Sequence, residues 1–171
     1  MLFRSNITYE KIKEKADAEA ADATAEAAET TERRQKGKRP IDFLTIEAAD
    51  EVVVLQRKSY CAWYSEALRV PMAVAWHLTA DHTDGAYKRK GATFREDAEV
   101  ASSATTYDYM QSGYDRGHMC PSGDNKWDAE AQQQSFLLTN VCPQNHQLNA
   151  GDWNDLEQRC RTWARRYGDI Y

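Results

Sequence analysis

The 171-residue sequence lacks the features that define several large classes of protein. It has no run of about 18 apolar residues, which excludes a membrane-spanning helix, and its first residues hold no apolar stretch long enough for a signal peptide. Four cysteines are too few for a disulfide scaffold. Basic charge is also in the minority, because 22 Lys and Arg face 27 Asp and Glu. A net charge of -5 argues against a nucleic-acid coat or a histone-like role.

The composition changes near residue 40. Eight of the 13 residues 16–28 are alanine, and the others are Asp, Glu and Thr. Alanine and glutamate favour a helix, but this stretch has no wide apolar face to bury. Residues 1–39 are therefore predicted to form a solvated helix or a disordered segment. Residues 40–171 are predicted to form one folded domain with a single core.

The domain shows strand and helix patterns in alternation. Residues 51–57 are rich in β-branched side chains and predict a strand, with residues 72–79 as its hairpin partner. A short helix is predicted at 128–134, and the apolar run 136–141 predicts a buried strand. The segment 114–118 is expected to be extended or looped. Together these elements predict the α+β class.

The last predicted element is a helix that begins near Asn149. At about 100° per residue, its apolar side chains share one face: Trp153, Leu156, Cys160, Trp163 and Tyr167. Gly168 is a natural stop for this helix. Residues 169–171 resemble the opening of a strand, so the chain is expected to be incomplete at its carboxyl end.

The four histidines differ in their surroundings. His77 lies in a predicted strand and is expected to be structural, and His82 is expected in an exposed turn. His118 and His146 lie in irregular polar segments close to cysteines. These two are the candidates for chemistry.

Spacing alone allows a zinc site. His118 and Cys120, together with Cys142 and His146, could supply the four soft ligands of a Cys2His2 centre. The competing interpretations are two small buried thiols, a disulfide between Cys120 and Cys142, and a Cys–His nucleophile. The sequence leaves these alternatives open.

The same segment also fits hydrolysis of a phosphodiester. Such a reaction needs a base for water, a cation for the anionic transition state and support for the leaving oxygen. His118 and Arg116 meet the first two needs, and Asn149 and Glu157 offer hard oxygen ligands for magnesium. In the simpler interpretation, Asn149 caps the helix with Asp152 in the capping box, and Glu157 is a solvated flank.

These residues form parts of a longer pattern: Asp115-Arg116-Gly117-His118, Leu138-Thr139-Asn140, Pro143-Gln144, Asn149, Trp153 and Leu156-Glu157. In order and spacing the pattern resembles the signature of the DNA/RNA non-specific endonuclease family, most closely its Bacteroidales-type members. The resemblance implies a ββα-metal (His-Me finger) nuclease core with a partial antiparallel central sheet. It also implies periplasmic or secreted localisation.

The resemblance implies a role for each matched residue. His118 corresponds to the general base, Asn149 to the one direct protein ligand of Mg²⁺ or Mn²⁺, and Glu157 to the residue that orients metal-bound water. Arg116 corresponds to an arginine that contacts phosphate, and Asn140 to an asparagine that supports the active site.

Two further residues have less direct roles. Arg89 corresponds to a second phosphate-binding arginine, within the basic cluster 88–95 that carries four positive charges in eight residues. That cluster is either a solvated loop or a strip that contacts the nucleic-acid backbone. Asp115 is expected to be structural.

The predicted function is metal-dependent, sequence-non-specific cleavage of DNA and/or RNA, bound through the phosphate backbone. The alternative is a non-catalytic remnant that binds nucleic acid or a structural zinc. No membrane partner is expected, and the sequence makes no prediction of oligomeric state.

Overall fold

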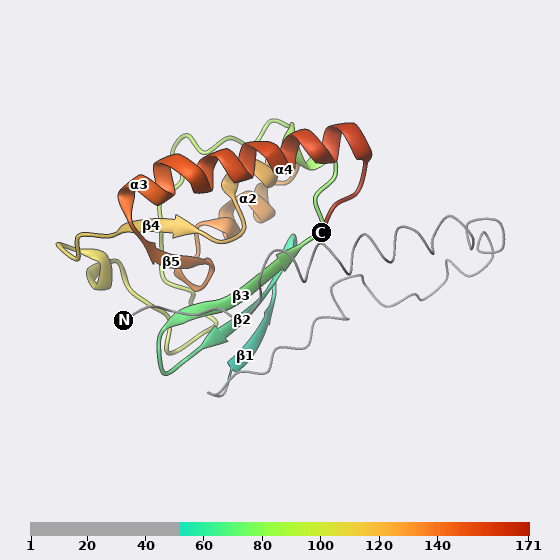
Figure 1. The fold of residues 1–171 in the computed structure, drawn as a ribbon. Coiled ribbons are helices and arrows are strands. Elements are labelled where there is room, and N and C mark those ends of the chain that lie inside the picture. The colour runs from blue at the N-terminus through green and yellow to red at the C-terminus, as the bar shows by residue number, and fades with distance from the viewer. Residues whose placement is uncertain (1–51) are drawn as a thin grey trace. The chain divides into compact units, whose positions relative to one another are not determined.

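A computed structural model describes residues 52–171 (Figure 1). The alanine-rich segment and the boundary predicted at residue 40 lie outside the described residues. The described part combines two antiparallel sheets with helices, which confirms the predicted α+β class. In Figure 1, the β4–β5 pair lies between the three-stranded sheet and the long carboxyl-terminal helix.

The three-stranded sheet consists of β1 (Val52–Gln56), β2 (Tyr60–Ser65) and β3 (Val70–Trp76) in the order β1-β2-β3. The predicted pairing of the first and third strands is wrong, because both pair with β2. All six residues of β2 are buried, so the strand has no alternation of polar and apolar side chains. This is why the sequence pattern did not predict it.

The two-stranded sheet pairs β4 (Asp115–His118) with β5 (Val141–Gln144). The strand predicted at 136–141 is wrong over most of its length, because Leu138–Asn140 forms a 3-10 turn (η5) and the strand begins only at Val141. All three residues of η5 are buried against β2 and β3. The apolar residues of the run are all buried, which accounts for the pattern without a continuous strand: Phe136, Leu137, Leu138 and Val141.

The first helix of the described part, α2 (Ala129–Ser135), confirms the helix predicted at 128–134. Asp128 caps it, because its carboxylate accepts hydrogen bonds from the backbone N–H of Glu130 and Ala131 at 2.8 and 2.9 Å. This cap fixes the start of the segment that leads to Phe136.

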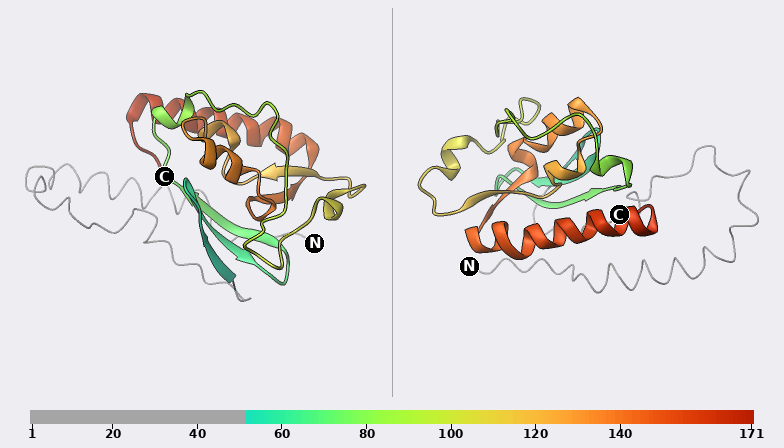
Figure 2. Two further views of the ribbon diagram at one scale, coloured as in Figure 1. Left: turned by 180° about the vertical axis from the view of Figure 1, so that it is seen from behind. Right: turned by 90° about the horizontal axis from the view of Figure 1, so that it is seen from above.

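The carboxyl-terminal helix is longer than predicted. It starts with α3 (His146–Leu148), continues through a π-helical turn (η6, Asn149–Trp153) and ends with α4 (Asn154–Tyr167), and these run end to end (Figure 2). Gly168 ends it with φ of 93°, as the sequence predicts.

The predicted apolar face of this helix is only partly covered. Trp153, Cys160 and Trp163 are half-buried, whereas Leu156 and Tyr167 are exposed. The fully buried residues of α4 are instead Arg161 and Ala164.

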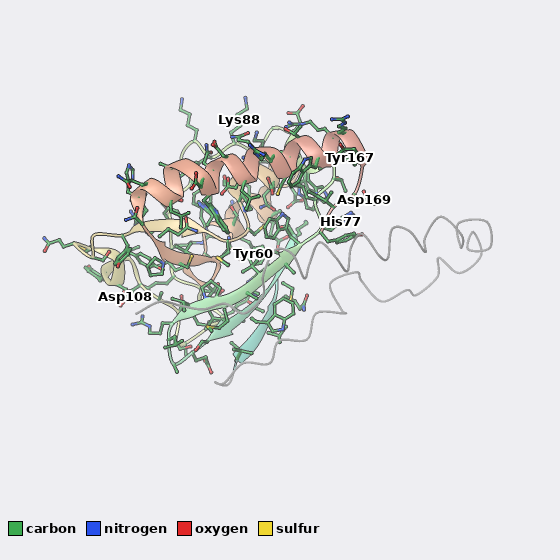
Figure 3. All side chains as sticks on the ribbon, viewed as in Figure 1. Tyr60, His77, Lys88, Asp108, Tyr167 and Asp169 are labelled. Carbon is green, nitrogen blue, oxygen red and sulfur yellow. The ribbon has the colours of Figure 1, made fainter. Side chains whose placement is uncertain are left out.

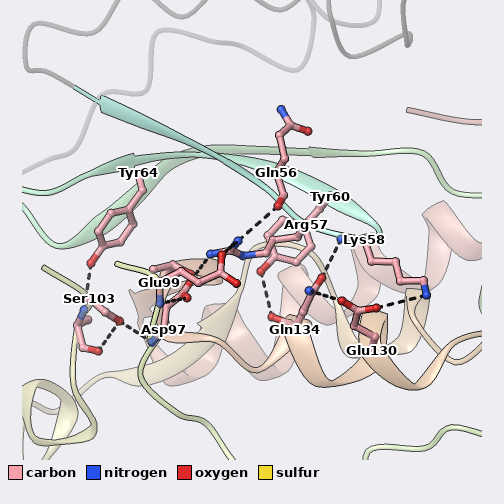
Figure 4. A network of polar contacts seen from close by, with 12 residues as sticks. Gln56, Arg57, Lys58, Tyr60, Tyr64, Asp97, Glu99, Ser103, Glu130 and Gln134 are labelled. Atoms are coloured by element: carbon pink, nitrogen blue, oxygen red, sulfur yellow. Dashed lines mark hydrogen bonds and ion pairs between the residues drawn. The ribbon is translucent and has the colours of Figure 1, made fainter. Parts of the chain in front are cut away.

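The turn between β1 and β2 ties the sheet to the rest of the domain (Figure 4). The guanidinium of Arg57 pairs with Asp97 at 2.5 Å and with Glu99 at 2.7 Å. Asp97 in turn accepts a hydrogen bond from the hydroxyl of Thr139, in η5, at 2.7 Å. The hydroxyl of Tyr60 donates to the carbonyl of Gln134 in α2. These contacts hold three segments against the three-stranded sheet: the loop that contains Asp97 and Glu99, the turn η5, and the helix α2.

The end of the chain returns to β3. Leu78 and Ile170 exchange two backbone hydrogen bonds, of 2.9 and 3.0 Å, in an isolated bridge, so the strand predicted at 169–171 is present only as this bridge. The ring of His77 stacks on Tyr171 and pairs with Asp169 at 3.4 Å (Figure 3). His77 therefore has a packing role, one residue beyond β3.

His82 differs from its prediction. It lies in a short 3-10 turn (η2, Asp81–Thr83), but its ring is half-buried, stacked on Trp127, and bonded through Nδ1 to the carbonyl of His77. The exposed position predicted for it is wrong, because an aromatic neighbour distant in sequence covers the ring. Among the helices of residues 52–171, none has the length and apolar character that a membrane span needs.

Candidate functional site

A cleft of about 500 Å³ lies between β4 and the α3–α4 helical segment. Its lining is mainly polar and cationic: Arg89, Arg116, His118, Ser122, Gly123, Lys126, Gln132, Asn149, Ala150, Asn154, Glu157 and Arg161. Five of the six residues that the sequence placed in the site line this cleft. The sixth, Asn140, does not.

His118 is the last residue of β4 and is 7% exposed. Its ring packs against Phe94 and Phe136, with both centroids at 4.9 Å. Burial, with a smaller contribution from the charge of Arg89, lowers the pKa of His118 to about 3. The imidazole is therefore neutral near pH 7 and has a free lone pair, as a general base must.

The two ring nitrogens of His118 have different surroundings. Nε2 is enclosed and has no hydrogen-bond partner. This leaves Nδ1 as the nitrogen that a water molecule in the cleft can approach. The sequence did not predict Phe94 and Phe136 as neighbours of His118, because single aromatic residues in loops show no periodic pattern.

The backbone around His118 is held from two sides. The indole of Trp153 donates to the carbonyl of His118 at 3.2 Å, which joins the helical segment to β4. Gly117 has no room for a side chain, since a Cβ there would lie 2.1 Å from the side chain of Gln144. Any larger residue at 117 would displace the buried side chain of Gln144.

Asn149 is not a helix cap. Asn145 caps the helix instead, by accepting from the backbone N–H of Gln147 at 2.9 Å, and Asn149 has helical φ and ψ of -60° and -46°. The side-chain Nδ2 of Asn149 donates to Asp115 at 3.0 Å. Because a carboxylate only accepts, this bond fixes the orientation of the amide and leaves Oδ1 available to a cation.

Asp115 connects two residues of the helical segment to β4. The oxygen that accepts from Asn149 also pairs with Nδ1 of His146 at 2.8 Å. These hydrogen bonds, that from Asn149 first, lower the pKa of the Asp115 carboxyl. Asp115 therefore stays ionised and positions Asn149, which agrees with its predicted structural part.

The structure contradicts the Cys2His2 zinc site that spacing alone allowed. His146 is bound to Asp115, and Cys120 is fully buried in a cluster with Tyr60 and Ala62. Among residues 52–171, no three His, Cys, Asp or Glu side chains are grouped so that they could hold a metal ion.

The other cysteine interpretations are also settled by the structure. Cys120 and Cys142 are free thiols, so the disulfide is absent, and Cys142 lies against Met119 with the sulfurs 3.5 Å apart. Burial raises the pKa of both thiols, which opposes the thiolate that a nucleophile requires. The structure comes closest to the interpretation of small packed thiols, with Cys120 buried and Cys142 half-buried.

Glu157 is a lining residue and not a solvated flank. Its side chain is 20% exposed, and burial raises the pKa of its carboxyl. Nη2 of Arg161, one helical turn later, lies 3.5 Å from Oε2 of Glu157. Glu157 thus presents a partly desolvated carboxyl to the same cleft as Oδ1 of Asn149.

The sequence-based interpretation missed Arg161. Its guanidinium pairs with the buried carboxylate of Asp124 at 2.7 Å, and Asp124 also accepts from the indole of Trp76 at 3.0 Å. A Cβ at Gly123 would lie 2.6 Å from this guanidinium. The spacing of four residues between Glu157 and Arg161 was the available signal.

Asn140 lies behind the cleft and is fully buried. Its amide accepts from the N–H of Cys120 at 2.9 Å and donates to the carbonyls of Cys120 and Ser135 at 2.9 and 2.8 Å. These bonds hold the chain two residues after His118. The contacts place Asn140 with the residues that support the site, and not with those that line it.

Arg89 and Arg116 line the cleft with exposed guanidinium groups. Arg116 lies over the ring of Phe94 at 5.0 Å, and Arg89 over that of Phe136 at 5.8 Å. Within the described part of the chain, neither forms an ion pair, so both charges are available to an anion. Lys88, in the same basic cluster, is exposed (Figure 3).

This fold and this cleft match a known family. The family model of DNA/RNA non-specific endonucleases matches residues 44–171, and the chain belongs to this family. Its members are metal-dependent nucleases that act on nucleic acids. The predicted ββα-metal class is confirmed by the structural likeness described next.

The relatives include mitochondrial nucleases. The chain is 43% identical to "Nuclease EXOG, mitochondrial" of Xenopus laevis over 110 residues, which are 63% of this chain and 31% of that protein. It is 36% identical to human "Endonuclease G, mitochondrial" over 67% of this chain and 39% of that protein. The chain thus matches about a third of the length of these relatives.

A solved structure shows the same fold. The crystal structure of the EndoG/EndoGI complex aligns with a TM-score of 0.66 and 29% sequence identity, over 72% of this chain and 52% of the matched chain.

Proposed function

We propose that this chain hydrolyses phosphodiester bonds of DNA and RNA without sequence specificity, with His118 as general base and one Mg²⁺ ion at Asn149. The observation that carries the proposal is the content of one cleft. A buried neutral imidazole, a free amide oxygen and two unpaired arginines all line it. These are the parts that in-line attack of water on a phosphodiester requires.

His118 accepts the proton of the attacking water. Its aromatic surroundings disfavour the imidazolium in the resting site, so the lone pair is free before the reaction. A positioned base of this kind contributes about 10²–10⁴-fold to the rate. Asn140 and Trp153 keep its backbone in place.

The oxygen donors suit a hard divalent cation. Asn149 offers its carbonyl oxygen because Asp115 holds the amide nitrogen, and Glu157 offers a carboxylate to water molecules around the ion. Mg²⁺ keeps most of its water, so one direct protein ligand is sufficient, and Mn²⁺ accepts the same donors. Such an ion stabilises charge on the leaving oxygen when it is bound.

Arg89 and Arg116 bind the phosphate groups. Contacts to phosphate carry no information about the base, which accounts for cleavage without sequence specificity. Since the neighbouring Lys88 and Lys90 are exposed, they extend the cationic surface along the nucleic-acid backbone.

A cleavage assay on the purified chain tests this proposal. Supercoiled plasmid and a folded RNA are each incubated with Mg²⁺, with Mn²⁺, with Zn²⁺ and with EDTA. We expect cleavage of both substrates with Mg²⁺ or Mn²⁺ and none with EDTA. Binding of plasmid without cleavage under every metal condition would overturn the proposal in favour of a non-catalytic nucleic-acid-binding domain.

A further inference from the structure

A second hollow, of about 300 Å³, adjoins the cleft. It shares Arg89, Arg116 and Asn149 with the cleft, but the rest of its wall includes three aromatic side chains, Phe94, Tyr109 and Tyr114. We call it the aromatic hollow. The catalytic roles proposed above use none of these three rings to contact substrate.

Tyr114 is the exposed ring of this hollow. Its side chain is 56% exposed, although its backbone is fixed. The N–H of Tyr114 donates to the hydroxyl of Ser112 at 3.2 Å, and that hydroxyl donates to the carbonyl of Tyr109 at 3.0 Å. Gly113, with φ of 79°, completes the turn. The turn therefore presents a large apolar ring to solvent from a defined position.

The other two rings are held against the protein. Tyr109 is half-buried, and its hydroxyl donates to the carbonyl of Val141 in β5 at 3.2 Å. Phe94 lies between His118 and Arg116, with centroid distances of 4.9 Å to the imidazole and 5.0 Å to the guanidinium carbon. The hollow thus has a rigid wall and one accessible ring.

The position of Tyr114 along the chain relates it to the catalytic residues. Side chains two residues apart in an extended segment point to the same face. Arg116 and His118 are spaced in this way within β4, Tyr114 directly precedes the strand, and Arg116 lines both the cleft and the hollow. An aromatic ring, a phosphate-binding cation and the general base therefore follow one another along one edge.

The charge of the hollow also suits a nucleotide. Arg89 and Arg116 bear unpaired positive charge, whereas the one carboxylate in the wall, that of Asp115, is already bonded to Asn149 and His146. When the anionic phosphate of a nucleotide binds to the arginines, the planar base of that nucleotide can stack on the ring of Tyr114. Every base has an aromatic face, so this contact is compatible with cleavage that ignores sequence.

We infer that the aromatic hollow is a subsite for one unpaired nucleotide next to the scissile phosphate, with its base stacked on Tyr114 and its phosphate on Arg116. The inference rests on the proposed nuclease function. A base inside a duplex is already stacked on its neighbours and cannot offer its face to the ring. The subsite therefore selects single-stranded DNA or RNA, or unpaired stretches, over intact duplex.

Binding without cleavage tests the subsite directly. Fluorescence anisotropy in EDTA is measured with three labelled probes of about 12 nucleotides: a single strand, the same strand annealed to its complement, and a strand of abasic nucleotides. Tyr114→Ala should weaken binding of the single strand by about 5- to 100-fold and change the duplex and abasic affinities little. Tyr114→Phe should bind as the parent does, since it keeps the ring.

Tyr107→Ala is the matched control, because that ring is 76% exposed but does not line the hollow. We expect it to bind all three probes like the parent. Equal losses on base-containing and abasic strands, an unchanged affinity of Tyr114→Ala for the single strand, or an equal loss in Tyr107→Ala would overturn the subsite. Failure of the proposed function appears separately, as a parent chain that binds these probes but cleaves no plasmid with Mg²⁺.

Discussion

Two carboxylates hold the two sides of the cleft, and they do so in different environments. Asp115, at the start of β4, is one-third exposed and orients Asn149, and its pKa is lowered by the groups that bond to it. Asp124 is fully buried and holds Arg161, which contacts Glu157. Burial raises the pKa of Asp124 despite this partner. A carboxylate thus orients the proposed metal ligand Asn149 on one side of the cleft, and another holds the arginine next to Glu157 on the other side.

The comparison shows why the two positions should respond differently to mutation. At Asp124 the cost of desolvation outweighs the attraction to Arg161, so the pair itself adds little stability. Removing Asp124 alone, however, leaves the buried guanidinium of Arg161 with only the 3.5 Å contact to Glu157. At Asp115 solvent can replace a lost partner, so loss of the carboxylate should affect the position of Asn149 more than the fold.

The largest expected effect is therefore on stability, at the inner carboxylate. Asp124→Asn should lower the free energy of unfolding by about 3–5 kcal/mol, because the buried guanidinium of Arg161 then keeps only its longer, 3.5 Å contact with Glu157. Urea unfolding followed by tryptophan fluorescence measures this loss. Asp128→Ala, which removes the cap of α2, is the control and should cost about 1 kcal/mol. A loss at Asp124 no greater than in this control would show that the inner carboxylate is not essential.

At the outer carboxylate, the expected change is in metal dependence. Asp115→Ala should raise the Mg²⁺ concentration at half-maximal cleavage by about 10- to 100-fold, as is typical when a group that orients a metal ligand is lost. The urea midpoint should stay close to that of the parent. Asn149→Ala should shift the same titration at least as far. An unchanged Mg²⁺ requirement in Asp115→Ala would show that Asp115 does not position a metal ligand.

Near neutral pH, the smallest effect is a dependence of stability on pH that comes from His118. Its pKa is about 3 in the folded chain and about 6.5 in an unfolded one, so only the unfolded state binds a proton between these values. Stability should be unaffected by His118 above pH 6.5 and should fall below it, with a slope of about 1.4 kcal/mol per pH unit from this residue. Urea unfolding of the parent and of His118→Asn, at several values between pH 4 and 7, measures the difference. Parallel curves would contradict the enclosed, neutral imidazole.

The catalytic signature was predictable from the sequence because it is local. The proposed general base and a proposed phosphate-binding arginine are two residues apart in β4, and Asn149 and Glu157 are two turns apart on one helix. Spacing within one strand or one helix does not depend on the rest of the fold. The helix predicted from Asn149 to Gly168 was correct in type and at its end, because its apolar side chains recur at helical spacing over most of its length.

The parts that the sequence did not predict depend on distant contacts. Strand β2 is buried on both faces, so its pattern resembles that of no single element, and the pairing of β1 with β3 was wrongly expected. The turn η5 resembled a strand because it is buried. The environment that lowers the pKa of His118 comes from Phe94 and Phe136, which are 24 and 18 residues away in sequence. The zinc interpretation was wrong for the same reason, since spacing does not show that Cys120 and His146 lie apart.

The central claim is that His118 activates water in the cleft. The most direct measurement is the rate of plasmid cleavage at saturating Mg²⁺ for the parent, His118→Ala and His77→Ala, with unfolding and DNA binding followed in parallel. The account predicts a loss of about 10²–10⁴-fold for His118→Ala, with folding and DNA binding retained, and parent-like cleavage for His77→Ala. Cleavage by a folded His118→Ala variant within a few-fold of the parent would contradict it.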